Sequence, residues 1–212
     1  MSATDTYHHG DLRRALLDAA LVLIGKKGVA GLSLREVAAG VGVSHAAPYH
    51  HFADKTALIH ALGNEGMELL DAHMASAEKA AGDDPRARLL GIGMAHVAFA
   101  VQHPEYYATF SSPEMQTPPS AEDAAASDRT PGGTWVRLFN AVLACQASGD
   151  LPAGDPMVLA VYLWSLVHGL AELWRTGPLE QLPQAADGLE ALAIQVLNAA
   201  LGAMHTTEGS QG

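Results

Sequence analysis

Residues 34–52 read LREVAAGVGVSHAAPYHHF, and this segment holds the pattern that points most directly to a function. Ala38 and Gly42 lie four positions apart, which gives a small side chain on a first helix and a glycine in the turn after it. Val37 and Val43 would fill the junction between two crossing helices. The second helix would project polar side chains from its N-terminal end, which is the end that meets base edges in the major groove. The pattern therefore indicates a helix-turn-helix that reads DNA, and its alternative is an ordinary helical corner.

Other kinds of chemistry find no support in the sequence. The chain contains no His-Glu-x-x-His, Gly-x-Ser-x-Gly, phosphate-binding-loop or Gly-x-Gly-x-x-Gly motif. The histidine pairs 8–9 and 50–51 lack the acidic or cysteine companions of a closed metal site. Cys145 is the single cysteine, which is typical of a reducing compartment, and no basic neighbour favours its use as a redox sensor. We therefore expect no enzyme, no cofactor and no metal.

The elements that position the first motif are predicted to be helices, because 49% of the chain is apolar and strand-type runs are scarce. Ser33 and Glu36 form a capping box, and Ser44 would cap the next helix. Pro48 would tighten the start of that helix, since proline has no amide to donate. Residues 111–133 would form a mobile connector, and the last eight residues a frayed end. About nine helices are expected, over residues 11–27, 34–40, 45–51, 54–81, 85–102, 104–110, 135–148, 155–177 and 184–204.

The distribution of charge permits DNA binding but does not establish it. The chain carries a net charge of −11, yet residues 1–60 sum to +1 and the remainder to −12. An acidic body repels DNA, whereas a near-neutral N-terminal part can approach it. The most apolar segment, 157–171, is about 15 residues long and shorter than the ~20 needed for a membrane span. With no signal-peptide pattern in the first 25 residues, we expect a soluble cytoplasmic protein without a membrane partner.

Residues 10–62 resemble the N-terminal domain of the TetR family of bacterial regulators. A second segment, 163–169 (LWSLVHG), resembles the Trp…His-Gly signature of one branch of that family, whose C-terminal regulatory domain is named for it. The resemblance implies an all-α fold, with an N-terminal three-helix helix-turn-helix domain and a C-terminal helical bundle for regulation and dimerisation. The N-terminal resemblance rests on Ala19-Ala20, Gly28, Leu34-Arg35-Glu36-Val37-Ala38, Gly42-Val43-Ser44, Tyr49-His50-His51-Phe52 and Lys55.

The same resemblance assigns DNA-binding roles position by position. His45, Ala46 and Ala47 fall where family members reach base edges; alanine methyls would touch thymine methyls, and the imidazole would bond guanine or adenine. Tyr49 and Lys55 fall where the family contacts phosphates. The expected interface is completed by Arg35, whose alternative is an ordinary surface arginine, and by Ser44 and His50.

Two apolar helices near the C-terminus predict dimerisation. Residues 157–174 are apolar nearly all round, and residues 189–201 carry a wide apolar stripe, so both offer more apolar surface than one bundle needs. We expect a two-fold bundle with a second copy, the alternative being an intramolecular core. The candidate interface residues are Leu163, Leu189, Leu192, Val196, Leu197 and Leu201.

A pocket for an unknown small-molecule effector is expected among aromatic and histidine side chains of the C-terminal part. For each candidate, core packing is the alternative, and for His168 a ligand and a core carbonyl are equally open partners. Gly63 and Gly66 also have two interpretations: they soften a long helix so that the DNA-reading part swings, or they allow close packing. The pocket candidates are Phe99, His103, Tyr106, Tyr107, Phe110, Trp135, Trp164 and His168.

These expectations combine into one functional hypothesis. Residues 1–53 would bind DNA, residues 54–206 would bind ligand and dimerise, and residues 207–212 would be a disordered tail. The protein would be a dimeric transcriptional regulator, a repressor by family analogy, released from a palindromic double-stranded operator by a small molecule. The alternative is a helical dimeric interaction or ligand-sensing protein that does not bind DNA.

Overall fold

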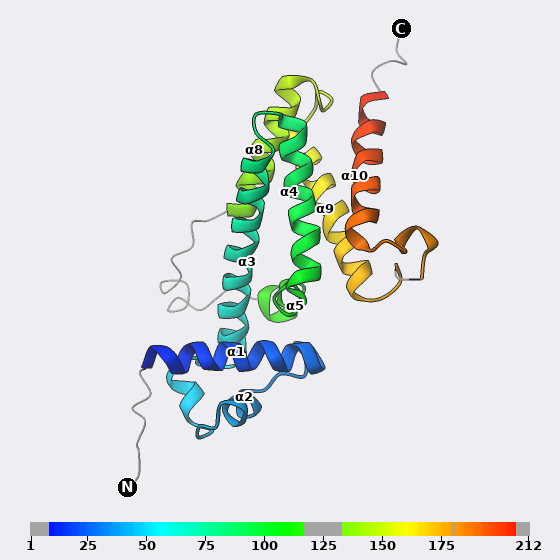
Figure 1. Cartoon of the computed structure of the whole chain (residues 1–212). Helices are drawn as coiled ribbons and strands as arrows, with labels where there is room; N and C mark the ends of the chain where they lie inside the picture. Colours follow the sequence, from blue (N-terminus) through cyan, green and yellow to red (C-terminus); the bar gives the residue numbers. More distant parts are fainter. Residues whose placement is uncertain (1–8, 117–132, 180, 207–212) are drawn as a thin grey trace. The chain divides into compact units, whose positions relative to one another are not determined.

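In the computed structural model of the chain, residues 9–116, 133–179 and 181–206 are described, and every regular element in these ranges is helical (Figure 1). They contain nine α-helices, two short 3₁₀ helices and no strand, which confirms the predicted all-α class. The N-terminal elements are α1 (His9–Lys27), α2 (Leu34–Val41), the 3₁₀ helix η1 (Ala47–His50) and α3 (Lys55–Ala80). The later elements are α4 (Pro85–Gln102), α5 (Pro104–Phe110), α6 (Pro113–Gln116), α8 (Gly133–Ser148), α9 (Pro156–Arg175), the 3₁₀ helix η2 (Pro183–Ala185) and α10 (Leu189–Thr206).

The helix ends follow from capping residues that the sequence shows. Ser33 begins α2, and its hydroxyl accepts a hydrogen bond from the Glu36 amide at 3.3 Å. Gly42 ends α2 in the left-handed region, at φ 78°, which favours glycine. The Asp54 carboxylate accepts from the Ala57 amide at 2.8 Å at the start of α3. Aspartates begin α4 and α9 in the same way.

The helix predicted over 45–51 is instead the 3₁₀ turn η1, which begins two residues later. Its cap residue, Ala46, makes no side-chain hydrogen bond. The predicted Ser44 side-chain cap is wrong: Ser44 contributes its backbone carbonyl, which accepts from the Ala47 amide at 3.0 Å. Pro48 is buried and has no amide to bond back along a regular helix, so the turn tightens.

Two other boundaries differ from the prediction. The expected connector 111–133 begins with a further helix, α6, and residues 117–132 lie outside the described residues, as do 207–212. The last helix was expected from residue 184. A 3₁₀ turn stands there instead, and α10 begins only after Gly188, whose φ of 92° interrupts any regular helix.

The chain folds into two compact units. Unit 1 comprises α1, α2, η1, α3 as far as Gly66, α5 and α6, and unit 2 comprises α3 from Met67, α4, α8, α9, η2 and α10. The contacts therefore group α5 and α6 with the N-terminal helices, which a boundary drawn along the chain at residue 53 does not do.

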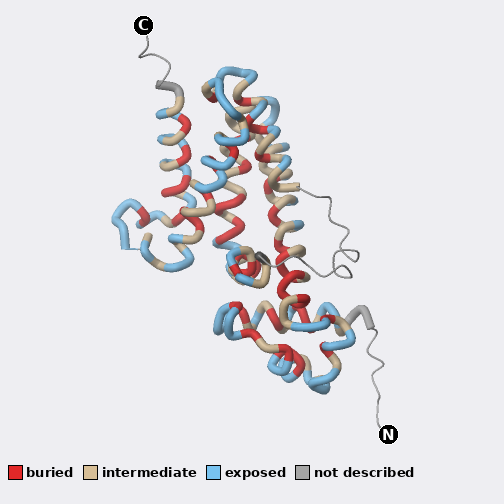
Figure 2. The backbone as a smooth tube through the Cα atoms, turned by 180° about the vertical axis from the view of Figure 1, so that it is seen from behind, coloured by how far each residue is buried: buried red, intermediate tan, exposed pale blue. Residues whose placement is uncertain are grey.

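The core of unit 1 forms where α1 packs against α2 and α5. Leu16 and Ala20 of α1, Val37 and Ala38 of α2, and Leu58 of α3 are fully buried. Figure 2 shows buried residues where these helices face one another and exposed residues on the outward turns. Of the two predicted junction residues of the helix-turn-helix, Val37 is fully buried in this core and Val43 is partly buried.

Gly63 and Gly66 on α3 are explained by close packing. A Cβ atom on Gly63 would lie 2.5 Å from the Met115 sulfur of α6. One on Gly66 would lie 3.1 Å both from the Tyr106 Cβ and from the Phe110 ring of α5. Of the two interpretations left open by the sequence, the structure thus favours packing, and these glycines make room for α5 and α6.

Unit 2 is built around α4, which packs against α8, α9 and α10 (Figure 1). Gly93 lets α4 approach its neighbours closely, because a Cβ there would lie 3.2 Å from Leu197 and 3.5 Å from Val167. Their shared core cluster consists of Val97, Val167, Leu170, Leu189, Ala193 and Leu197.

Helix α9 is, by length and composition alone, apolar enough to cross a membrane, and it is the one such helix in the described part of the chain. Its 20 residues exceed the 15-residue apolar stretch recognised in the sequence. The same composition suits a helix that packs on two sides. Leu163, Val167 and Ala171 give it one face buried within unit 2.

His96 is the one buried ionisable group of α4 among the described residues, and its ring centroid lies 6.0 Å from that of His168. Burial first, and the neighbouring His168 second, lower the pKa of His96 to about 3. An unfolded chain would hold this imidazole near its ordinary pKa of about 6.5. Between about pH 6.5 and 3, the imidazole is therefore protonated in the unfolded state and neutral in the folded state.

We predict that His96 makes the fold less stable in mild acid. Stability contributed by the neutral ring is fully present above about pH 6.5 and is lost as the pH falls toward 3, at up to about 1.4 kcal/mol per pH unit. Urea unfolding between pH 7 and 5 measures this slope. In His96→Leu, the free energy of unfolding should fall less steeply with falling pH, by the amount that corresponds to about one proton, whatever its stability at pH 7. Equal slopes for the two proteins would contradict the prediction.

Candidate nucleic-acid interface

The candidate interface is the outer surface of α2, η1 and the first turn of α3. Arg35 lies exposed on α2. Ser44, His45 and Ala46 are exposed on the turn that leads into η1. This surface consists of short side chains and imidazole on a rigid corner whose inner side is buried.

Further along η1, the side chains alternate between solvent and core. Tyr49 is 54% exposed and His50 is also exposed, whereas Ala47 is partly buried. Pro48 and Phe52 are buried. The tight 3₁₀ turn thus presents a phenol and an imidazole outward while proline and phenylalanine hold it to the core.

Lys55 is placed differently from the other predicted contacts, because its ammonium already has partners. Its Nζ donates to the Ala30 carbonyl at 3.1 Å and lies 3.2 Å from a carboxylate oxygen of Glu114. The Lys55 side chain is 30% exposed and that of Glu114 is 20% exposed. Glu114 lies on α6, far from Lys55 in the sequence, so no local sequence pattern predicts this ion pair.

Ion pairs also engage Arg14 and Lys27. Lys27 bonds the Glu36 carboxylate, and this contact, followed by the hydrogen bond from Ser33, lowers the pKa of Glu36. The sequence predicted the Ser33–Glu36 cap but not the lysine. In the described part of unit 1, the cations that form no ion pair are Arg13, whose guanidinium lies 5.3 Å from the centre of the Phe52 ring, and Lys26 and Arg35.

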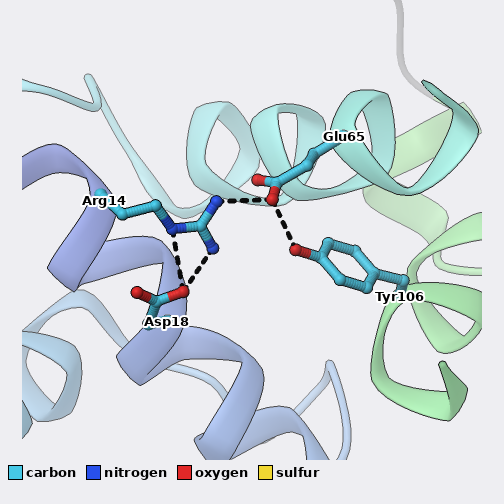
Figure 3. A network of polar contacts seen from close by, with 4 residues as sticks. All are labelled: Arg14, Asp18, Glu65 and Tyr106. Carbon is cyan, nitrogen blue, oxygen red and sulfur yellow. Dashed lines mark hydrogen bonds and ion pairs between the residues drawn. The ribbon is translucent and has the colours of Figure 1, made fainter. Parts of the chain in front are cut away.

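A polar network ties α1 to α3 and α5 (Figure 3). The Arg14 guanidinium bonds both the Asp18 and Glu65 carboxylates, and the Tyr106 hydroxyl donates to Glu65 at 2.7 Å. Asp18 and then Glu65 raise the pKa of Arg14 despite its partial burial. Burial, followed by the bond to Glu65, raises the pKa of Tyr106 to about 12. Tyr106, predicted as a pocket residue, thus helps to fix α5 within unit 1.

Ring contacts join predicted pocket residues into two groups within unit 2, and three more of these residues lie in unit 1. In unit 2, Trp164 lies beside Trp135 and His168, with ring centroids 6.4 and 5.4 Å away. Also in unit 2, Phe99 and His103 have centroids 4.9 Å apart. The members in unit 1 are Tyr106, Tyr107 and Phe110, of which the last two have ring centroids 5.4 Å apart.

Two histidines that the sequence analysis missed belong to the groups in unit 2. His73 contacts the rings of both Phe99 and His103. His96 contacts His168. His96 and Phe99 lie three positions apart on α4, and this helical spacing is the signal that would have indicated His96.

The predicted dimer residues lie mainly inside unit 2. Leu163, Leu189, Leu192, Leu197 and Leu201 are buried, and Val196 is partly buried. Their side chains fill the core of this chain and leave little surface for a second copy. The exposed apolar residues of α9 and α10 are Met157, Val158, Val161, Tyr162, Trp164, Leu173 and Ile194.

Cys145 on α8 is fully buried, and burial raises its pKa to about 11. A thiol that remains protonated near neutral pH is a poor nucleophile. This finding favours the structural interpretation of Cys145 over the redox one.

Two family models cover most of the described chain. Residues 16–62 match the model "Bacterial regulatory proteins, tetR family". Residues 89–199, just over half of the chain, match the model "Tetracyclin repressor-like, C-terminal domain". The chain belongs to the TetR family. As a TetR-family transcriptional regulator, it combines a DNA-binding helix-turn-helix with a ligand-sensing C-terminal domain, and neither model describes an enzyme.

Individual relatives agree with this family. A protein of unknown function from Rhodococcus sp. RHA1 is 32% identical, with a TM-score of 0.76 over 95% of this chain and all of that one. The transcriptional regulator FadR from Bacillus subtilis, solved in complex with stearoyl-CoA, has a similar fold at 17% identity, with a TM-score of 0.70 over 91% of this chain and 99% of that one. The regulator BetI from Burkholderia thailandensis is 37% identical over 83 residues, which span 39% of this chain and only 43% of BetI.

We predict that Tyr106→Phe in this TetR-family regulator lowers the free energy of unfolding by about 1 kcal/mol, because a partly buried hydrogen bond to Glu65 is lost while Arg14 still neutralises the carboxylate. Chemical denaturation at pH 7 measures it. The matched control is Tyr49→Phe, which removes an exposed hydroxyl and should change stability by less than about 0.5 kcal/mol. Equal effects of the two substitutions would refute the network's contribution.

Proposed function

We propose that this TetR-family protein is a cytoplasmic, homodimeric repressor that binds a palindromic operator and is released by a small-molecule effector. The observation that carries the proposal is the set of exposed side chains on the outer surface of a folded helix-turn-helix, at Ser44, His45, Ala46, Tyr49 and His50. Repression, rather than activation, rests on the family's repressor-like description. The test is a gel shift with DNA from upstream of its own gene against random DNA. A protein that shifts neither is the dimeric ligand-sensing alternative.

Base reading is assigned to the turn before η1. His45 and Ala46 are exposed, and Ala47 lies beside them, partly buried. The imidazole can donate to a guanine or accept from an adenine amino group, while the alanine methyls suit thymine methyls. With so few side chains reaching bases, each should carry a large share of the sequence preference.

Phosphate contacts are assigned to the rim of the same surface. Tyr49, Ser44 and His50 offer exposed polar groups, and Arg35 is a cation without an ion pair in the described chain. Lys55 is the remaining member, with its ammonium shared between Ala30 and Glu114. Such contacts fix register and orientation and carry no sequence information.

Dimerisation is assigned to the outward faces of α9 and α10. Val158, Val161 and Tyr162 expose apolar surface on one side of α9. Among the described residues, a Cβ atom on Gly169 of α9 or Gly202 of α10 would meet nothing within 4 Å. Glycine destabilises a helix interior, and packing within the described chain does not explain its presence at these two positions. Close approach of a second copy would explain it.

Effector binding is assigned to the C-terminal domain, residues 54–206, with residues 1–53 as the DNA-binding part. The two aromatic–histidine groups of unit 2, around Trp164 and around Phe99, are the candidate lining. They combine apolar rings with imidazoles that can orient a polar group. The Trp…His-Gly branch of the family remains our assignment for this domain, and FadR bound to stearoyl-CoA illustrates that a relative takes a ligand.

We predict that His45→Ala relaxes base preference at one position of each operator half-site, at about 1–3 kcal/mol. Operator variants that change one base pair at a time, titrated with both proteins, measure this. The control is His50→Ala, which should weaken binding to all sequences equally because a phosphate contact ignores base identity. An unchanged preference at every position would remove His45 from the set of base-reading residues.

We predict that Val161→Glu splits the dimer without unfolding the chain. Val161 is 44% exposed, so the fold tolerates the charge, whereas an apolar contact with a second copy does not. Sedimentation velocity at micromolar protein reports the mass. Val22→Glu on α1, where the valine is 56% exposed, is the same chemical change and should leave the dimer intact. A wild-type protein that sediments as a monomer would contradict the assignment.

A further inference from the structure

Helix α6 brings an acidic side chain to the cation at the start of α3. The Glu114 carboxylate lies 3.2 Å from the Lys55 ammonium, and that ammonium also donates to the Ala30 carbonyl at 3.1 Å. Both side chains are partly shielded from water. A phosphate that approaches Lys55 therefore meets an ammonium that already has two partners, one of them a negative charge.

Two further contacts hold α6 in this place. The His60 ring is buried, and its Nε2 donates to the backbone carbonyl of Glu114 at 2.9 Å. Met115 fills the space above Gly63, where a Cβ would lie 2.5 Å from its sulfur. The Lys55–Glu114 pair, the His60 hydrogen bond and the packing of Met115 thus all dock α6 along the first turns of α3.

We propose that Glu114 competes with a DNA phosphate for Lys55, so that docked α6 lowers the affinity of this protein for DNA. The inference rests on the proposed DNA-binding function and adds a regulatory contact to the same surface. Losing Lys55 as a phosphate contact matters in this protein because few other cations are available. In the described residues of unit 1, the cations that form no ion pair are Arg13, Lys26 and Arg35. Withdrawal of α6 both frees a cation and removes an anion from the path of the phosphate.

The competition also gives an effector a route to the DNA. Docked α6 and a phosphate on Lys55 exclude one another, so whatever stabilises one of them weakens the other by the same factor. An effector that holds α6 on α3 lowers DNA affinity, which is the direction that release from an operator needs. No bend at Gly63 or Gly66 is required.

The decisive experiment uses the full-length protein and a short fluorescent DNA duplex of random sequence, because a phosphate contact needs no operator. Fluorescence anisotropy gives the affinity between about 50 and 200 mM salt. Glu114→Gln should bind about two- to fivefold more tightly at the lowest salt, as expected for the loss of a partly exposed ion pair. Its salt dependence should steepen by about one unit per protomer.

Two comparisons separate competition from a general charge effect. In a Lys55→Gln background, Glu114→Gln should have no effect. Glu105→Gln on α5 removes the same charge at a position that contacts Gly25 rather than Lys55, and should bind as wild type does. Tightening of equal size in Glu105→Gln or in the Lys55→Gln background would overturn the proposal, as would an unchanged or weaker Glu114→Gln.

A second variant covers the case in which Glu114→Gln does not fold. His60→Phe leaves the Lys55 and Glu114 charges in place but removes the hydrogen bond that holds the Glu114 carbonyl, so it too should tighten binding. A folded His60→Phe that binds as wild type does would then overturn the inference. Failure of every variant to bind any duplex overturns the DNA-binding function itself, whereas a wild type that binds with no change in Glu114→Gln overturns the competition alone.

Discussion

Two side chains are missing from one face of α3, at Gly63 and Gly66, and the N-terminal unit is organised around the room that this leaves. Met115 fills the first space, and Tyr106 with Phe110 fills the second. Because α5 and α6 lie so close, their polar groups reach α3: the Tyr106 hydroxyl donates to Glu65, and the Glu114 backbone carbonyl accepts from His60. A steric property of two glycines thus decides which electrostatic contacts the unit makes.

Those contacts leave the proposed DNA-binding surface with few free cations, so its recognition of DNA would depend on shape more than on charge. The turn before η1 presents small side chains, and Pro48 holds it against the core. Half of the nearby cations bond carboxylates of the same unit. Cations that are paired with carboxylates attract phosphates less, and the net charge of −11 repels DNA as well. Both effects weaken binding to random DNA, which depends on charge alone.

The local features of this fold were predictable, and the long-range ones were not. Ser33, Gly42 and Asp54 set helix ends through bonds to residues within a few positions, and these ends lie where the sequence placed them. The start of η1 was misplaced because Pro48 removes an amide inside the turn and overrides Ser44 as a cap. The pairing of Lys55 with Glu114, and the burial of Leu197 within its own chain, depend on tertiary packing that no spacing encodes.

The burial of Cys145 has a practical consequence for anyone who wishes to watch this protein move. It is the single cysteine of the chain, and its thiol is buried and stays protonated near neutral pH. Thiol-directed dyes and spin labels react with the thiolate and need access to it. A cysteine introduced at an exposed site such as Tyr49 would therefore react far faster than the native one. Site-specific labels could be attached to the natural sequence background without first removing a residue from the core of α8.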